Sequence, residues 1–201
     1  MQETSFDRKW YCDLWISFIK GNSDAFSELY RSFYKSLYSY GLSLKMQEEQ
    51  VRDIIQDLFV KLYARPELVK DTSTLRSFLF TSMRNACINS IKMEQRLASL
   101  DTIDGFEINY SINNNNIEDK EELDRIKILV RNILNQLTPR QREIIYLRFL
   151  HQMEYEEISK IMDLSEQAAR NLVYRAMDKM RKDNPDINPF MVFLLLMFVC
   201  R

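Results

Sequence analysis

The chain has 201 residues, of which 46% are hydrophobic and 28% are charged, with only three Gly and four Pro. This composition is typical of a soluble globular protein, and so few helix breakers favour helices over the turn-rich strands of a sandwich or barrel. Three widely spaced Cys and one His exclude a disulfide framework and a Cys/His metal cluster. The N-terminus lacks the apolar core of a signal peptide, so we expect a cytoplasmic protein. We also expect neither a cofactor nor a metal.

The net charge of −1 hides an uneven distribution of charge along the chain. Residues 1–96 carry 14 basic and 12 acidic side chains, residues 97–124 carry 1 and 8, and residues 125–183 carry 12 and 8. The acidic stretch includes an Asn run and lacks helical periodicity, which is typical of a linker. We predict one domain over 1–96, an acidic flexible linker over 97–122, a second domain over 123–183 and an apolar tail over 184–201.

In the N-terminal block, helical spacing of apolar residues predicts a helix in SDAFSELYRSFYKSLYSYGLSL and another in EEQVRDIIQDLFVKLYARP. Pro66 ends the second helix. The exposed face of that helix is expected to carry Asp53, Gln56, Asp57 and Val60. A charged face is usually no more than a solvated surface, but an exposed valine at its centre favours a protein interface.

A third helix is predicted in TLRSFLFTSMRNACINSIKMEQR, after a loop over residues 66–74. One face of it carries Asn85, Asn89, Lys92 and Arg96, with Arg84 beside them. Amide and cationic groups of this kind can hold phosphates and the edge of an unstacked base. We therefore consider this face a candidate DNA-binding surface.

The C-terminal block opens on strong helix-start signals in LTPRQREIIYLRFL. Thr138 suits an N-cap, Pro139 suits the first helical position, and Gln141 completes a capping box. A short helix follows in EYEEISKIMDL, with Tyr155 and the apolar residues after it expected to face inward.

Ser165 is the candidate N-cap of the last helix, in LSEQAARNLVYRAMDKMRK. Its apolar residues, from Ala169 to Met180, share one narrow arc, and Asp178 lies on the opposite, polar arc. Two helices joined by the tight MDLS turn predict a helix-turn-helix, whose second helix can enter a DNA major groove. The DNA-facing candidates on that second helix are Gln167, Arg170, Asn171, Tyr174 and Arg175.

The string from LTPRQREIIYLRF to YEEISKIMDLSEQAARNLVYRA resembles the region that recognises the minus-thirty-five promoter element in bacterial sigma factors of the extracytoplasmic-function group. VRDIIQDLFVKLY and FLFTSMRNACINSIK are similar to the polymerase-binding and DNA-contacting helices of the same family. The resemblance implies an all-α fold of two small domains, sigma region 2-like and sigma region 4-like. It implies core RNA polymerase, promoter DNA and an anti-sigma factor as partners, with no small-molecule substrate and no enzymatic activity.

The resemblance also implies the role of each candidate surface. Asp53, Gln56, Asp57 and Val60 would bind polymerase. Arg84, Asn85, Asn89 and Lys92 would contact the minus-ten element, and the five candidates on the last helix would contact the upstream element. Two alternatives stay open: a helix-turn-helix regulator that binds operator DNA without joining polymerase, and an interaction protein without a DNA function.

Three departures from the family pattern affect these expectations. Asp163 stands at the turn where Gly is common, and Asp tolerates the left-handed conformation better than most residues. Leu172 and Met177 replace residues that are frequently basic, which reduces phosphate contacts. The tail has 11 consecutive apolar residues from Phe190 to Cys200, too few to span a bilayer. An exposed run of this kind needs a cover, which could be the protein's own helical domains, an inhibitory partner or a membrane surface, and we favour packing on one of the helical domains.

Overall fold

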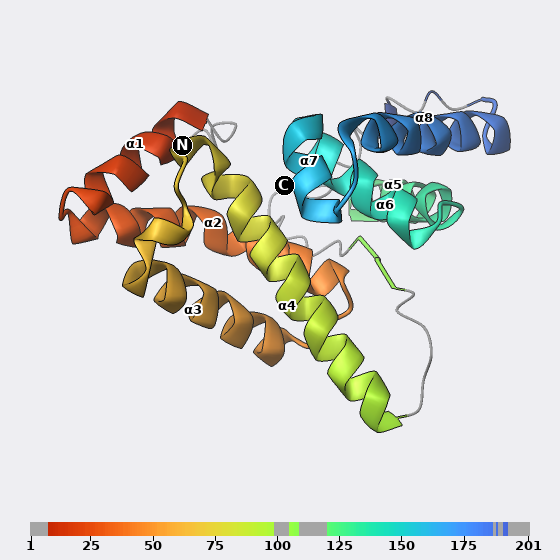
Figure 1. The fold of residues 1–201 in the computed structure, drawn as a ribbon. Coiled ribbons are helices and arrows are strands. Elements are labelled where there is room, and N and C mark those ends of the chain that lie inside the picture. Colours follow the sequence, from red (N-terminus) through yellow and green to blue (C-terminus); the bar gives the residue numbers. More distant parts are fainter. Residues whose placement is uncertain (1–7, 99–104, 109–119, 187, 189–190, 193–201) are drawn as a thin grey trace. The chain divides into compact units, whose positions relative to one another are not determined.

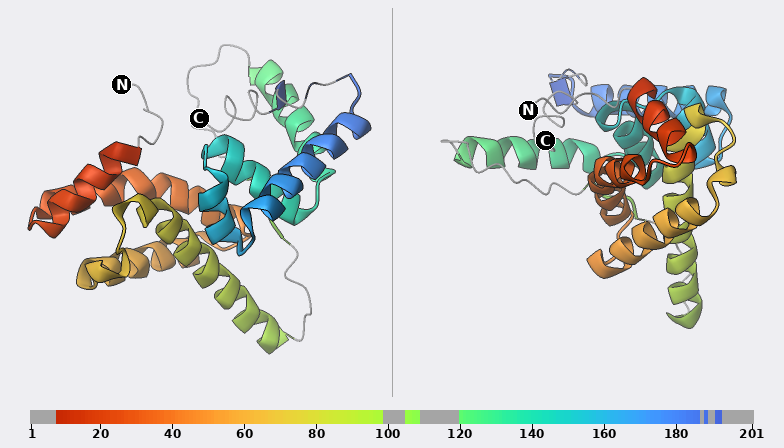
Figure 2. Two further views of the ribbon diagram at one scale, coloured as in Figure 1. Left: turned by 45° about the horizontal axis from the view of Figure 1, so that its top comes forward. Right: turned by 90° about the vertical axis from the view of Figure 1, so that its left-hand side faces the viewer.

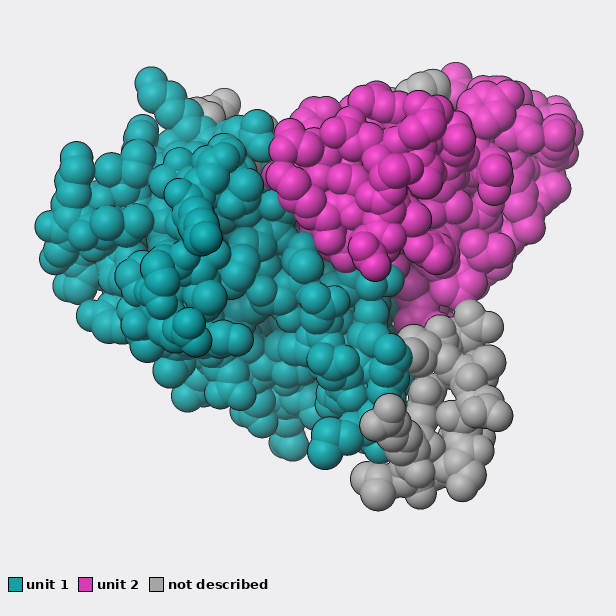
Figure 3. Space-filling model, in the orientation of Figure 1, with its two compact units in different colours: residues 1–103 teal, residues 104–201 magenta. Residues whose placement is uncertain are grey.

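The computed structural model describes residues 8–98, 105–108, 120–186, 188 and 191–192, and every regular element in these ranges is helical (Figures 1 and 2). The predicted all-α fold is confirmed. The chain divides into two compact units, residues 1–103 and 104–201 (Figure 3).

Unit 1 is built around three helices that contact one another, and a further helix packs against α2. That further helix, α1, was not predicted from the sequence, although it buries Tyr11 and Trp15 almost completely. The loop after α3 contains two short 3₁₀ turns, with Val69 buried between them. The elements are α1 (Arg8–Ile19), α2 (Ser23–Ser43), α3 (Glu48–Ala64), η1 (Pro66–Leu68), η2 (Thr72–Thr74) and α4 (Leu75–Ala98).

The three central helices approach closely at Gly41 of α2. A Cβ atom added there would lie 2.5 Å from Met83 Cε of α4 and 2.9 Å from both Cγ atoms of Val51 in α3. Such distances leave no room for a side chain, so glycine is required by packing and not by backbone conformation. The close approach holds α3 and α4 against the same helix, and the outer faces of these two helices carry the candidate sites of unit 1.

Unit 2 has a core around α8, which packs against α6 and α7. α6 continues directly into a π-helical turn, η3, whose tyrosine and first leucine are buried. The helix before α6, α5, was also not identified from the sequence. The elements are α5 (Lys120–Asn135), α6 (Pro139–Ile145), η3 (Tyr146–Leu150), α7 (Tyr155–Met162) and α8 (Glu166–Asp183).

The predicted caps and turn of the C-terminal block are confirmed. Thr138 accepts a hydrogen bond from the Gln141 amide at 3.3 Å, and Gln141 accepts one from the Thr138 amide at 3.0 Å. Ser165 accepts a hydrogen bond from the Ala168 amide at 3.1 Å. Asp163 adopts the left-handed conformation, with φ 52° and ψ 63°, and this residue turns the chain from α7 into α8.

The predicted linker and tail are described only in part. Phe106 and Ile108 are buried, and the Phe106 ring contacts the Tyr146 ring of unit 2 at a centroid distance of 5.3 Å. α5 begins at Lys120, inside the range predicted as linker. In the tail Val192 is buried, whereas Phe190 and residues 193–201 lie outside the described residues, as does most of the predicted linker. The boundaries at 97–122 and 184–201 therefore stay predictions.

Candidate functional sites

The outer face of α3 has the exposure that its helical spacing predicts. Asp53, Gln56 and Asp57 are exposed, and Val60 keeps 61% of its surface accessible. The two carboxylates form no ion pair with any residue that the structure describes, whereas nearby Arg52 pairs with Glu48 at 2.7 Å. We call Asp53, Gln56, Asp57 and Val60 the α3 face. It combines free negative charge with an exposed apolar side chain, which suits a cationic protein surface with an apolar contact.

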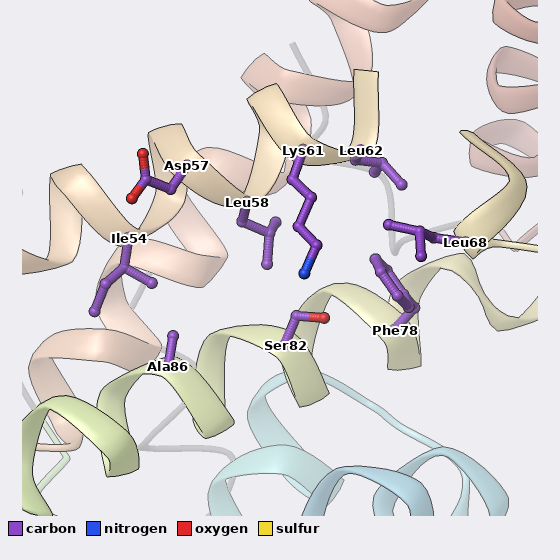
Figure 4. A pocket seen from close by; sticks show the side chains of 9 residues that line it. All are labelled: Ile54, Asp57, Leu58, Lys61, Leu62, Leu68, Phe78, Ser82 and Ala86. Atoms are coloured by element: carbon purple, nitrogen blue, oxygen red, sulfur yellow. The ribbon is translucent and has the colours of Figure 1, made fainter. Parts of the chain in front are cut away.

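A hollow of about 210 Å³ opens beside the α3 face, between α3 and α4 (Figure 4). Ile54, Leu58 and Phe78 supply apolar walls, and Lys61 extends from α3 towards Ser82 of α4 (Figure 4). Asp57 belongs both to the α3 face and to the lining of this hollow. A partner bound to the α3 face would therefore lie next to the hollow. The partial exposure of Ile54, which was predicted on the apolar stripe, follows from its place in this lining.

Asn85, Asn89 and Lys92 lie exposed along α4, as predicted. Arg84 beside them is half-buried and already engaged by the protein, so it is less available to a ligand than the other three. The side chain of Arg96 lies outside the described residues. We call Asn85, Asn89 and Lys92 the α4 face, and its amides and ammonium group can donate to phosphates and base edges.

Cys87 lies on the inner side of α4, between the two asparagines in sequence but away from their face. The side chain is fully buried, and burial raises the pKa of the Cys87 thiol to about 12. The thiol therefore stays protonated at neutral pH and is no nucleophile. Cys87 belongs to the core that supports the α4 face.

The outer face of α8 carries all five predicted upstream-element residues, and each is exposed: Gln167, Arg170, Asn171, Tyr174 and Arg175. Four of them lie in the first half of the helix and Arg175 follows directly after it, and the N-terminal part of a recognition helix is the part presented to base edges. Gln167 donates to Asn171 Oδ1 at 3.1 Å, and Arg170 pairs with Glu166 at 3.3 Å. Tyr174 has 69% of its surface exposed, so its ring and its hydroxyl group are accessible to a ligand.

The C-terminal half of α8 is less suited to DNA. Asp178 pairs with Lys182 at 2.8 Å, an arrangement that raises the pKa of Lys182 through its hydrogen bond to Asp178. Leu172 and Met177 are half-buried and offer no charge to phosphates. Arg170 and Arg175 are the basic residues among the predicted DNA-facing set, and Lys179 and Arg181 add positive charge further along the helix.

The sequence prediction misplaced Tyr155, which was expected to face the core. Its side chain is only partly buried, and its ring lies near the guanidinium groups of Arg148 and Arg170, with centroid distances of 4.8 and 4.5 Å. Ile158, Ile161 and Met162 of the same helix are buried as predicted. Helical spacing placed Tyr155 at the edge of the apolar arc, and only the fold shows which side chains contact its ring.

Within the described part of the chain, His, Cys, Asp and Glu form no group of three that could hold a metal ion. None of the helices described there has both the length and the apolar character that crossing a bilayer requires.

Unit 2 contains a helix-turn-helix, and unit 1 is a second helical unit with polar faces of its own on α3 and α4. The family model "Sigma-70 region 2" matches residues 29–97, and "Sigma-70, region 4" matches residues 127–180. The first match includes the α3 and α4 faces, and the second includes α6, α7 and most of α8. A helix-turn-helix regulator of operator DNA would not account for the first match, and this alternative is not favoured.

Curated relatives are similar over most of the chain. The ECF RNA polymerase sigma factor SigM of Bacillus subtilis is 24% identical over 155 residues, which cover 77% of this chain and 91% of that protein. The ECF RNA polymerase sigma factor SigL of Mycobacterium tuberculosis is 23% identical over 168 residues, which cover 81% and 93%. The solved structure of CnrH, in complex with the cytosolic domain of CnrY, has a TM-score of 0.54 at 22% identity, covering 90% of this chain and 99% of that one. It supports the fold.

The chain belongs to the sigma-70 family of bacterial RNA polymerase sigma factors, in the extracytoplasmic-function group.

Proposed function

We propose that this chain binds core RNA polymerase and directs promoter-specific transcription initiation. The observation that carries the proposal is the presence, on one chain, of a free acidic α3 face in a region 2 unit and an exposed Arg/Asn/Tyr face in a region 4 unit. A regulator that only binds operator DNA needs the second face but not the first. The chain acts in the cytoplasm as a DNA-binding initiation factor, and the polymerase supplies the catalysis.

The α3 face binds the polymerase. Asp53 and Asp57 lie one turn apart and carry free carboxylates, and Val60 extends the same exposed stripe by another turn. Asp53→Arg with Asp57→Arg should abolish co-purification with core polymerase, because reversing both charges repels a basic partner. Asp13→Arg with Glu28→Arg is the matched control, since it makes the same charge change at exposed positions of α1 and α2. Equal co-purification of both double variants would show that the α3 face is only a solvated surface.

The α4 face contacts the minus-ten element during strand opening. Asn85 is exposed and can pair with the edge of an unstacked base. Asn85→Ala should leave closed-complex formation intact and reduce the permanganate reactivity of unpaired thymines in the minus-ten region. The exposed Asn132 of α5 supplies the control variant Asn132→Ala. Normal permanganate reactivity of the Asn85→Ala holoenzyme on linear DNA would remove Asn85 from the site.

The outer face of α8 recognises the upstream element. A bidentate arginine contact to a base is worth about 1–3 kcal/mol, so Arg170→Ala or Arg175→Ala should weaken promoter binding by the holoenzyme about 5- to 150-fold. Each variant should also relax the preference for one base pair of the element. Unchanged affinity together with unchanged sequence preference would refute the assignment.

An anti-sigma factor belongs to the proposed set of partners. This part of the proposal is supported by the similarity to CnrH, which has been solved with the cytosolic domain of CnrY bound. The hollow between α3 and α4 adjoins the polymerase-binding residues, so a protein seated over it would compete with polymerase.

A further inference from the structure

Tyr155 connects three segments of the helix-turn-helix unit through its ring. It is the first residue of α7, and its ring lies near Arg148 of η3 and Arg170 of α8. The guanidinium carbons lie 4.8 and 4.5 Å from the ring centroid, within the range in which a cation is attracted to an aromatic face. Two guanidinium groups repel each other, so other contacts must hold them close to the same ring.

Arg148 is held on the protein side. Its Nη1 atom donates to the Met153 carbonyl at 2.6 Å and lies 3.3 Å from a carboxylate oxygen of Glu154. Only 28% of its side chain is exposed. The Met153 carbonyl and the Glu154 carboxylate therefore hold this guanidinium, and the cation held there restrains the Tyr155 ring beside it.

Arg170 is the more exposed arginine of the pair. Its side chain is 52% exposed, and its other contact is an exposed ion pair with Glu166 one turn earlier. An exposed ion pair of this kind restrains a long side chain only weakly. Contact with an oriented aromatic ring removes further rotamers before DNA arrives, which reduces the entropy lost on binding.

Stacking and base recognition use different parts of the guanidinium group. The guanidinium carbon of Arg170 lies over the ring, 4.5 Å from its centroid. A guanidinium held by its face in this way would keep its N–H edge available for hydrogen bonds to a guanine or a phosphate. Arg170 can therefore stay on Tyr155 while it binds DNA. Arg175 offers the comparison, because it has no ring contact, hydrogen bond or ion pair with any residue described in the structure.

We propose that Tyr155 is a positioning residue for promoter recognition, which holds Arg170 ready for the upstream element through ring stacking. This inference rests on the proposed role of α8 in upstream-element binding. Its effect passes through Arg170 alone, and the aromatic ring of Tyr155, not its hydroxyl group, is what matters.

The test is a double-mutant cycle on the full chain in holoenzyme. The probe is a labelled promoter duplex selected from random-sequence DNA by the wild-type holoenzyme. Tyr155→Leu should weaken binding about two- to fivefold, the range expected for an exposed cation–π contact. Tyr155→Phe keeps the ring and should bind as the wild type does. In an Arg170→Ala background Tyr155→Leu should have no further effect, whereas in an Arg175→Ala background it should keep its full effect.

Four outcomes would overturn the inference. Equal losses for Tyr155→Phe and Tyr155→Leu would assign the effect to the hydroxyl group. The same loss in the Arg170→Ala background would show a structural role or an independent DNA contact. Wild-type binding by Tyr155→Leu, with Arg170→Ala weakened, would leave the proposed function standing and remove Tyr155 from it. If Arg170→Ala itself binds normally, both the α8 assignment and the positioning role fail. Tyr155→Met replaces Tyr155→Leu in the cycle if the latter does not fold.

Discussion

Gly41→Ala is expected to destabilise unit 1, although alanine is the better helix former. The substitution in α2 gains about 1 kcal/mol of helix propensity. Against this gain, the new Cβ would lie 2.5 Å from Met83 Cε and 2.9 Å from both Cγ atoms of Val51. Met83 can move its terminal methyl group aside at little cost. Val51 cannot, because its two methyls fill two of three staggered positions and every rotamer leaves one facing Gly41.

The expected net effect follows from these opposing contributions. Overpacking of a core costs about 1–3 kcal/mol, so after the propensity gain of about 1 kcal/mol we expect Gly41→Ala to lower the free energy of unfolding by up to about 2 kcal/mol. Urea unfolding followed by tryptophan fluorescence measures this directly, because both tryptophans, Trp10 and Trp15, lie in α1 and Trp15 is fully buried.

The matched control is Gly41→Ala in a Val51→Ala background. Val51→Ala removes both methyl groups and with them the rigid part of the steric clash, so Gly41→Ala should be neutral or stabilising in this background. A Gly41→Ala protein that is more stable than the wild type would refute the reasoning. So would a cost that is the same in both backgrounds.

Three further predictions concern the turn, the core thiol and the tail. Asp163→Val should lower the melting temperature, at a cost of about 1–2 kcal/mol, because a β-branched residue resists the left-handed conformation; an unchanged melting temperature would contradict this. Burial raises the pKa of Cys87 to about 12 from 9.0, so the unfolded thiol ionises first as the pH rises above 9 and stability falls between these values. In urea unfolding, the free energy of unfolding of the wild type should fall by about 1.4 kcal/mol more per pH unit than that of Cys87→Ala, and equal pH slopes for the two proteins would count against this prediction. Truncation after Asn188 removes the buried Val192 and should lower the melting temperature of the protein; if the truncated chain melts normally and stays monomeric, the tail does not pack on its own domains.

Sequence patterns predicted the parts of the fold that local chemistry determines. Thr138 and Ser165 are caps because their hydroxyl groups satisfy backbone amides within three residues, and this signal does not depend on the rest of the fold. The exposure of Asp53 and Val60 followed from helical spacing in the same way.

The missed elements depend on tertiary packing. α1 has apolar residues on several sides, since Trp10, Ile16 and Ile19 are exposed while Tyr11 and Trp15 are buried, so its sequence shows no clear apolar stripe. α5 begins among acidic residues that continue the composition of the predicted linker. The π-helical turn at Tyr146–Leu150 and the ring contacts of Tyr155 depend on tertiary contacts between segments, and the spacing of residues along the chain does not predict these contacts. The candidate faces were predictable because they are helix surfaces, whereas the residue that positions Arg170 was not.

Run-off transcription with purified core RNA polymerase tests the central claim most directly. The template is a promoter duplex selected by the holoenzyme, placed upstream of a reporter segment, with a scrambled upstream element as control. We expect a defined transcript that requires this chain, disappears with the scrambled element and is lost when Asp53 and Asp57 are both replaced by Arg. Core polymerase that gives no defined transcript with the chain present, or the same transcript from both templates, would contradict the account.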